Sequence, residues 1–183
     1  MGEQVKNSPA RVAGSDEILD RCLGAFVSAG TLDLSLDQLA ARVLVSKRML
    51  VHYFGGREAI EHGAMARLED RLRAQFLPEV FPAGVKAEAV VMALWDRTTA
   101  AESRGVLLLV MDLSRRAWNG SERAREFIYE QQRLWRELLG KFIPEEDMAE
   151  QVLQLFQGAM LAYLVTGDAK PGRRSLLRLL HVK

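Results

Sequence analysis

The fold is decided by the stretch LDQLAARVLVSKRMLVHYF, residues 36–54. Its apolar residues recur at helical spacing on both sides of a short apolar turn, which predicts two short helices packed against each other. Ser35 and Ser46 each stand directly before one of these helices. A serine there can accept a hydrogen bond from a backbone N–H that the first helical turn leaves unpaired. The stretch therefore predicts a helical hairpin whose second helix begins at a capped end.

The second helix of this hairpin carries cations and rings beside its apolar side. Lys47, Arg48 and Met49 follow the cap, and His52 and Tyr53 lie about one turn later. The N–H groups at a helix start can meet a phosphate, and arginine can make two hydrogen bonds to guanine in a major groove. The pattern favours contact with double-stranded DNA, with Lys47 and Tyr53 on phosphates. The simpler alternative is a solvated helix face.

Composition limits how such contact can arise. The chain has 183 residues, 49% of them hydrophobic and 27% charged, the balance of a globular protein. A net charge of only +1 means that DNA contact depends on a local patch. Cys22 is the only cysteine, which excludes an intrachain disulfide and a cysteine zinc cluster. The longest apolar run, residues 106–111, is too short to cross a membrane, and no signal-peptide order is present, so we expect a cytoplasmic protein without a membrane partner.

Helical spacing continues almost throughout the chain, so the expected fold class is all-α. Residues 1–14 look like a loose polar arm, and Ser15 is expected to cap the first helix, which Gly30 ends. A long helix from about Arg57 to Leu77 is closed by Pro78, because proline cannot continue a helix interior. Further helices are expected at about Lys86–Glu102, Gly105–Trp118, Glu122–Phe142, Glu145–Thr166 and Arg174–His181.

The segment from about residue 18 to residue 60 resembles the N-terminal domain of the tetracycline-repressor (TetR) family of bacterial transcription regulators. The resemblance implies a three-helix helix-turn-helix DNA-binding domain at residues 15–60 and a helical effector-binding and dimerisation domain at residues 61–183. Residues 1–14 would be a flexible N-terminal arm. The matching residues are Ile18, Leu19, Phe26, Gly30, Leu39, Ala40, Val45, Ser46, Lys47, Leu50, Tyr53, Phe54, Glu58 and Ile60.

The same resemblance assigns DNA contacts to individual residues. Arg57 stands where the family usually has a lysine that clamps a phosphate, and arginine can replace it in that role. The sequence departs from the family pattern in three places: Leu44 replaces a common turn glycine, Val51 replaces a tyrosine, and the acids Asp16 and Glu17 stand where the family often has a basic residue. The turn at Leu44 must therefore avoid positive φ or tolerate strain. The expected DNA-binding residues are Ser46, Lys47, Arg48, Met49, His52, Tyr53 and Arg57.

The expected helix at Glu145–Thr166 is apolar around more than half of its circumference. A surface helix needs only one apolar face, so this one is expected to contact both its own core and a second copy of the chain. A symmetric dimer would place two recognition helices about 34–36 Å apart, which suits a palindromic operator. The alternative is a helix that is simply central in a monomer. The expected interface residues are Leu155, Gly158, Ala159, Ala162, Leu176, Leu179 and Leu180.

Large, adaptable side chains recur at inward positions of the C-terminal helices, with polar residues among them. A few polar groups on apolar walls suit a small, largely apolar organic effector. The alternative is an ordinary core. Effector binding is expected to tilt the Arg57–Leu77 helix and so weaken DNA binding. The expected pocket residues are Trp95, Thr98, Met111, Trp118, Gln131, Trp135, Phe156 and Met160.

These observations predict a DNA-binding regulator that binds a palindromic operator as a homodimer, and the resemblance implies a ligand-responsive repressor. An enzyme is disfavoured, because the three histidines have no metal-site spacing and no glycine-rich phosphate loop occurs. No catalytic residue, metal or cofactor is therefore expected. The remaining alternative is a helical ligand-binding or protein-interaction bundle with degraded DNA recognition, which Leu44 and Val51 would fit.

Overall fold

The computed structural model describes residues 9–75, 81–82 and 84–181. Within these ranges the regular structure is helical and no strand occurs, which confirms the all-α prediction. The elements are α1 Pro9–Ala29, α2 Leu36–Val43, α3 Lys47–Phe54, α4 Arg57–Gln75, α5 Ala87–Thr98, the short 3₁₀ turn η2 Ala101–Ser103, α6 Arg104–Trp118, α7 Glu122–Phe142, α8 Glu146–Thr166 and α9 Lys170–Leu180.

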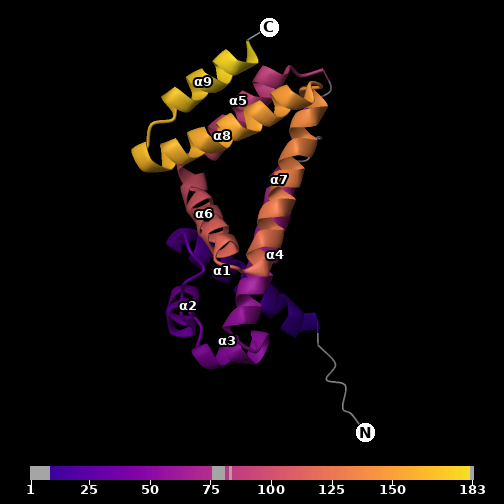
Figure 1. Cartoon of the computed structure of the whole chain (residues 1–183). Helices are drawn as coiled ribbons and strands as arrows, with labels where there is room; N and C mark the ends of the chain where they lie inside the picture. Colours follow the sequence, from indigo (N-terminus) through magenta and orange to yellow (C-terminus); the bar gives the residue numbers. More distant parts are fainter. Residues whose placement is uncertain (1–8, 76–80, 83, 182–183) are drawn as a thin grey trace.

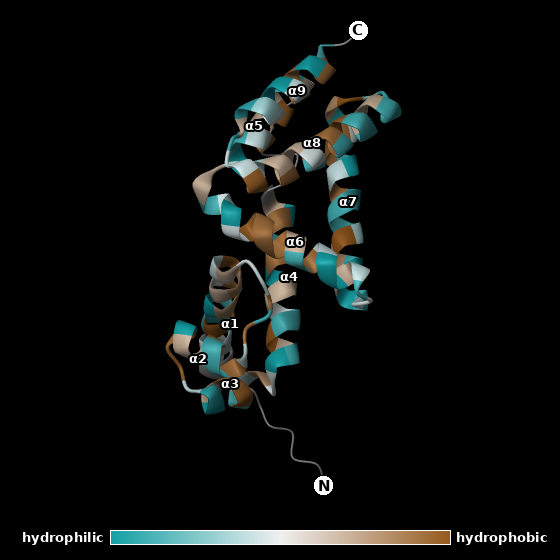
Figure 2. Ribbon diagram, turned by 60° about the vertical axis from the view of Figure 1, so that its left-hand side comes forward, coloured by the Kyte–Doolittle hydropathy of each residue, from teal (hydrophilic) through white to brown (hydrophobic). Residues whose placement is uncertain are grey.

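The molecule has two ends joined by three helices. Figure 1 shows a head made by α1 to α3 (residues 9–54) at one end and α5, α8 and α9 at the other. Helices α4, α6 and α7 run between them. Helix α3 lies at the end of the molecule opposite α9 in both Figure 1 and Figure 2. The short helix with the cations is therefore outermost, where a large partner can reach it.

Two clusters of buried side chains hold the chain together. The first joins the head to α4 and takes in Leu113 of α6 and Phe127 of α7. The second lies among α5 to α9 and takes in Leu107 of α6 and Leu138 of α7. Burying each such side chain stabilises the fold by about 1.5–3 kcal/mol. Helices α6 and α7 contribute to both clusters; the head packs on α4 and α6, and α7 packs on these two helices. Along α7, hydrophobic and hydrophilic residues alternate (Figure 2).

The predicted caps of the hairpin are confirmed. The Ser35 hydroxyl accepts a hydrogen bond from the Gln38 N–H at 3.2 Å, and the Gln38 side chain accepts one from the Ser35 N–H at 2.8 Å. The Ser46 hydroxyl accepts a hydrogen bond from the Met49 N–H at 3.1 Å. Gly55 ends α3 with φ of 82°, a left-handed conformation that suits glycine. Local sequence therefore sets both ends of α3.

The first helix begins earlier than predicted. Residues 9–14 belong to α1, so the expected arm at residues 1–14 and the Ser15 cap are wrong there; residues 1–8 lie outside the described residues. The reason is Pro9, which favours the first helical position because its nitrogen has no hydrogen to leave unpaired. Asp16, inside α1, forms an ion pair with Arg67 of α4 at 2.7 Å, which ties these two helices together.

The last helix also begins earlier than predicted, at Lys170, with Pro171 in its first turn. Gly172 is not a loop residue: a Cβ there would lie 2.5 Å from Cζ2 of Trp95, so glycine permits the close contact of α9 with α5. Helix α5 ends at Thr98, earlier than the expected Glu102, and the 3₁₀ turn follows. The expected end of α4 at Leu77 lies outside the described residues.

Candidate nucleic-acid interface and ligand cavity

Helix α3 has one buried side and one exposed side. Leu50 is fully buried and anchors the helix in the first core. Met49 and Val51, on either side of it, are 40% and 42% exposed. The exposed side thus combines cations with apolar side chains, as a surface that contacts both phosphates and base edges requires. It consists of Lys47, Arg48, Met49, Val51 and His52.

The turn that leads into α3 is strained. Leu44 has φ of 57° and ψ of 43°, the left-handed region, which costs a residue with a side chain about 1–2 kcal/mol. Its N–H donates to the Ala40 carbonyl, which closes α2. Of the two predicted possibilities, a turn that avoids positive φ and a turn that tolerates strain, the structure shows the second. Since Leu44 is 86% exposed, its side chain contributes little in return.

Lys47 is held by a carboxylate from the preceding helix. Its Nζ lies 2.9 Å from Oδ2 of Asp37, and both side chains are exposed. No local sequence pattern predicts this pair, because it depends on the angle at which α2 and α3 cross. A phosphate contact by Lys47 would have to compete with Asp37 or displace it.

Arg57 is engaged with the loop between α1 and α2. Its Nη2 donates to the Leu32 carbonyl at 3.0 Å and forms ion pairs with Glu61 at 2.7 Å and Asp33 at 3.8 Å. Burial raises the pKa of Glu61, although the charges of Arg57 and Arg116 act in the opposite direction. The guanidinium of Arg57 is thus engaged within the chain, and its role as a phosphate clamp stays a prediction.

The rings at the end of α3 lie between the exposed face and the core. His52 is exposed, and its ring meets that of Tyr53 edge-on at a centroid distance of 5.6 Å. Tyr53 is half-buried against the first core. A Cβ on Gly14 would lie 3.8 Å from the Tyr53 hydroxyl oxygen, which places that hydroxyl beside α1. The end of α3 thus lies beside α1 at Gly14.

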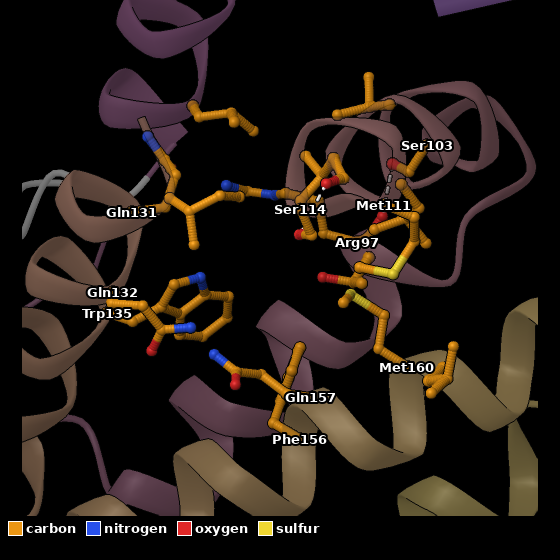
Figure 3. Close-up of a pocket in the computed structure, with 17 residues that line it drawn as sticks. Arg97, Ser103, Met111, Ser114, Gln131, Gln132, Trp135, Phe156, Gln157 and Met160 are labelled. Carbon is orange, nitrogen blue, oxygen red and sulfur yellow. Dashed lines mark hydrogen bonds between the residues drawn. The ribbon is translucent and has the colours of Figure 1, made fainter. Parts of the chain in front are cut away.

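A cavity of about 260 Å³ lies among α4 to α8. Six predicted pocket residues line it and point toward a common space, as Figure 3 shows for those it labels. Leu72 of α4 also lines it, so the cavity touches the helix that continues from the head. The six are Thr98, Met111, Gln131, Trp135, Phe156 and Met160.

Two tryptophans predicted for the pocket lie elsewhere, and both assignments are corrected. Trp95 is 1% exposed in the second core, where its Nε1 donates to the Ala169 carbonyl at 3.2 Å. Its ring packs edge-on against Phe156 at a centroid distance of 5.3 Å. Trp118 is 90% exposed, because it is the last residue of α6 and no described helix packs over that end.

The polar part of the cavity wall is larger than predicted. The hydroxyls of Ser114 and Ser103 donate within the chain, to the carbonyls of Val110 at 2.9 Å and of Arg97 at 2.8 Å. Several polar lining residues that were not predicted lie three positions from a predicted lining residue on the same helix. The helical periodicity that predicted Thr98, Gln131 and Phe156 could therefore have predicted these residues as well. The missed polar residues are Arg97, Ser103, Ser114, Gln132 and Gln157.

Asp112 connects the cavity wall to the head. It directly follows Met111, and its Oδ2 accepts hydrogen bonds from the Thr31 hydroxyl at 3.0 Å and the Leu32 N–H at 3.1 Å. Arg115 and Arg116 pair with its two oxygens at 2.6 and 3.0 Å. Burial opposes the charged form, but the hydrogen bonds from these arginines and from the loop outweigh it, so the pKa of Asp112 lies below its usual value. Helix α6 thus binds the α1–α2 loop directly.

Comparison with known proteins identifies the architecture. No protein-family model matches the sequence. The structure of a TetR-family transcriptional regulator from Streptomyces coelicolor superposes with a TM-score of 0.74 over 96% of this chain and 79% of that one, at 16% identity. A TetR transcription regulator from Haloarcula marismortui gives 0.72 over 92% and 97%, at 15% identity. The chain has the TetR fold.

The multidrug binding protein EbrR, solved in complex with imidazole, shares the TetR fold with a TM-score of 0.64 over 92% of this chain and 96% of that one, at 19% identity. Two curated relatives from Pseudomonas putida match over 89 residues, 48% of this chain, at 29% identity. They are the HTH-type transcriptional regulator SrpR and the uncharacterized HTH-type transcriptional regulator TtgW. The matched segment spans 40% of SrpR and 64% of TtgW.

Within the TetR fold, the predicted dimer residues fall into three groups by their burial in the single chain. Leu176 is fully buried in the chain's own core, so its assignment to an interface is corrected. Leu155, Ala159, Leu179 and Leu180 are half-buried against that core. Gly158 and Ala162 are exposed, and two residues that the sequence analysis missed, Leu161 and Val165, are 54% and 79% exposed on the same helix.

Other kinds of site find no support in the parts of the TetR fold that the structure describes. No group of three His, Cys, Asp or Glu side chains there is arranged to hold a metal ion. None of the helices in these parts combines the length and the apolar character needed to cross a bilayer.

Proposed function

We propose that this chain is a DNA-binding transcriptional regulator that acts as a ligand-responsive repressor and binds a palindromic operator as a homodimer. The observation that carries the proposal is α3, a capped helix with an exposed cationic and apolar face at the far end of the molecule. The two relatives named as HTH-type transcriptional regulators support it.

The capped start of α3 would approach a phosphate, and Arg48 would enter the major groove. Arg48 is exposed, and no ion pair engages it within the described ranges of the chain. Lys47 would contribute a phosphate contact against the competition of Asp37. One such helix offers few contacts, so we expect useful affinity only when a second subunit places its own α3 in the next turn of the groove.

Effector binding would act through the cavity. Its wall includes Leu72 of α4 and Met111 of α6, and both helices pack on the head. A ligand changes the head only if it binds two conformations of the chain with different affinity. The EbrR complex, a multidrug binding protein of the same fold holding a small molecule, supports a ligand-binding body.

The proposal is tested by fluorescence anisotropy of the purified protein on DNA that flanks its own gene, at two salt concentrations. Affinity should fall steeply with salt, because phosphate contacts release counterions. The double substitution Lys47→Ala, Arg48→Ala should remove preference for this DNA over unrelated DNA while the far-UV circular dichroism stays helical. A matched control, Arg125→Ala with Lys141→Ala, removes the same charge from exposed sites on α7.

Equal loss of binding in both double variants would reduce the interaction to net charge and reject α3 as the recognition helix. Wild-type affinity in the α3 variant would reject it as well. A protein that binds small molecules but prefers no genomic DNA fragment would instead be a ligand-binding bundle with degraded DNA recognition. Leu44 in a strained turn and Val51 on the exposed face favour that second candidate.

A further inference from the structure

One buried side chain in the cavity wall has a hydrogen-bond donor without an acceptor. Gln131 lines the cavity with only 8% of its surface exposed. No acceptor for its Nε2 lies within the described residues. The hydroxyls of Ser103 and Ser114 differ from it, since each already donates to a backbone carbonyl of the chain. A buried donor without an acceptor costs free energy, so a ligand oxygen beside Gln131 would be favoured.

The charges of the wall favour an uncharged ligand. No carboxylate is found among the described lining residues, so nothing there balances a cation. The one ionisable lining residue is Arg97, which is exposed and already has an interaction within the chain. An anionic ligand would therefore have to compete with an existing contact of Arg97. Moving a charge out of water is costly unless the charge is paired, and an uncharged ligand avoids this cost.

An aromatic pair lies one helical turn from the Gln131 amide. Gln131 and Trp135 are four positions apart on α7, a spacing that places both on one face with Cβ atoms about 5–6 Å apart. Phe156 of α8 meets Trp135 with the ring centroids 4.8 Å apart and the planes tilted by 49°. Figure 3 shows these three side chains around one space. A ligand ring packed on this pair can hold an oxygen near Gln131.

We propose that the cavity binds a small, uncharged aromatic compound with a carbonyl oxygen next to its ring, such as an aryl ketone. Gln131 Nε2 donates to that oxygen, and the ring packs against Trp135 and Phe156. The cavity volume of about 260 Å³ is just below the roughly 300–1,000 Å³ of pockets for drug-sized ligands, which suits a small molecule. This inference rests on the proposed effector function of the cavity and names the chemical class of the effector.

Isothermal titration calorimetry of the full chain without DNA tests the inference with four probes of nearly one shape, each a benzene ring with one small planar group. They are acetophenone, its hydrocarbon counterpart α-methylstyrene, benzoate and benzamidinium. Acetophenone should bind at least about 10-fold more tightly than either charged probe, because each charge leaves water without gaining an available partner.

Gln131→Met removes the donor and keeps a side chain of similar length. It should weaken acetophenone about 5-fold, as the loss of one hydrogen bond between uncharged groups does, and should not weaken α-methylstyrene. Infrared difference spectroscopy should give a lower C=O stretching frequency for acetophenone bound to the wild type than to this variant, because a hydrogen bond polarises the carbonyl. The matched control is Gln151→Met, an exposed glutamine on α8 that does not line the cavity, and it should change neither affinity.

The inference is overturned if acetophenone does not bind, if either charged probe binds as tightly, or if Gln131→Met weakens acetophenone and α-methylstyrene equally or weakens neither. In the wild type alone, a C=O frequency equal to that of acetophenone in an apolar solvent would overturn it as well. Operator binding without ketone binding rejects this inference alone, whereas ketone binding without operator binding rejects the regulator function alone.

Discussion

At the scale of single residues, the left-handed backbone conformation of Leu44 lowers the stability of the folded chain by a measurable amount. It is the one residue other than glycine with positive φ in the described ranges. Leu44→Gly should raise the free energy of unfolding by about 0.5–1 kcal/mol, because relief of left-handed strain exceeds the larger entropy that glycine loses on folding. Urea unfolding followed by circular dichroism measures this change. Leu44→Ala removes the exposed side chain but keeps the strain and should change little. A loss of stability in the glycine variant would contradict the strained turn.

Sequence alone predicted some residues of the candidate interface better than others. The caps at Ser35 and Ser46 were predictable, because a cap depends on residues three positions away along the chain. The partners of Lys47 and Arg57 were not, because they depend on how α3 crosses α2 and how α4 meets the α1–α2 loop. Long cationic side chains are placed by tertiary structure, so their roles could be predicted only by resemblance.

At the scale of the elements, we expect the ion pair between Lys47 of α3 and Asp37 of α2 to limit DNA affinity. Asp37→Asn should strengthen operator binding several-fold and steepen the salt dependence of the binding constant by up to about one ion, because Lys47 becomes available for a phosphate. The free energy of unfolding should change by less than about 1 kcal/mol, because exposed ion pairs contribute little to stability. Anisotropy over a salt series measures the effect. Asp70→Asn, an exposed acid on α4, is the control, and equal gains in both variants would refute a specific role of Asp37.

The contact between α1 and α6 requires a glycine. A Cβ on Gly105 would lie 2.4 Å from the Val27 carbonyl oxygen, a backbone atom that cannot move aside. Gly105→Ala should therefore destabilise the chain by about 1–3 kcal/mol, as overpacking does. Gly24→Ala, also in a helix but with nothing within 4 Å, should stabilise it by about 0.5–1 kcal/mol. Thermal unfolding of both variants measures the difference, and a similar effect of the two substitutions would argue against close packing of α6 on α1.

Helical periodicity predicted which elements exist and which faces they bury, but not which inward side chain reaches a cavity. Helix α7 was predicted with its observed bounds, since Ser121 and Pro144 mark its ends. Trp95 and Trp118 were both expected in the pocket because size and spacing alone do not distinguish a core position from the last turn of a helix. The early start of α9 depended on the fit of Gly172 against Trp95, a contact 77 positions apart in the sequence that no local pattern encodes.

At the scale of the whole molecule, Asp112 is placed to link ligand and head. Asp112→Asn should destabilise the chain by about 1.5–3 kcal/mol near neutral pH, because hydrogen bonds of a charged, buried carboxylate are lost. The pKa of Asp112 is lowered in the folded chain, so its stabilisation is complete above the usual value of 3.8 and is lost as pH falls through the folded value. The stability curves of wild type and variant should therefore converge in acid.

The same variant tests coupling. If α6 carries the effector signal to the α1–α2 loop, an effector that binds Asp112→Asn with unchanged affinity should reduce operator binding less than in the wild type. Calorimetry measures the affinity for the effector, and fluorescence anisotropy measures operator binding with and without the effector. Unchanged coupling, together with the expected loss of stability, would limit Asp112 to a structural role and leave α4 as the route between cavity and head.

The proposed dimer depends on the exposed side of α8. Gly158 and Ala162 are one turn apart there, and Leu161 and Val165 expose apolar surface beside them. In the single chain a Cβ on Gly158 meets nothing within 4 Å, so Gly158→Arg should leave the monomer folded. Across a close two-fold contact the same substitution would place two buried charges against each other, which we expect to shift the chain to monomers in sedimentation velocity.

Gly140→Arg on α7, an exposed glycine with equally open surroundings, should stay dimeric. Monomeric Gly158→Arg should also lose operator affinity although α3 is untouched, because one recognition helix alone cannot occupy two successive grooves about 34–36 Å apart. The two measurements must change together for the proposed assembly to hold. A Gly158→Arg chain that stays dimeric would place the interface on another face, and a monomer with full operator affinity would remove the need for a palindrome.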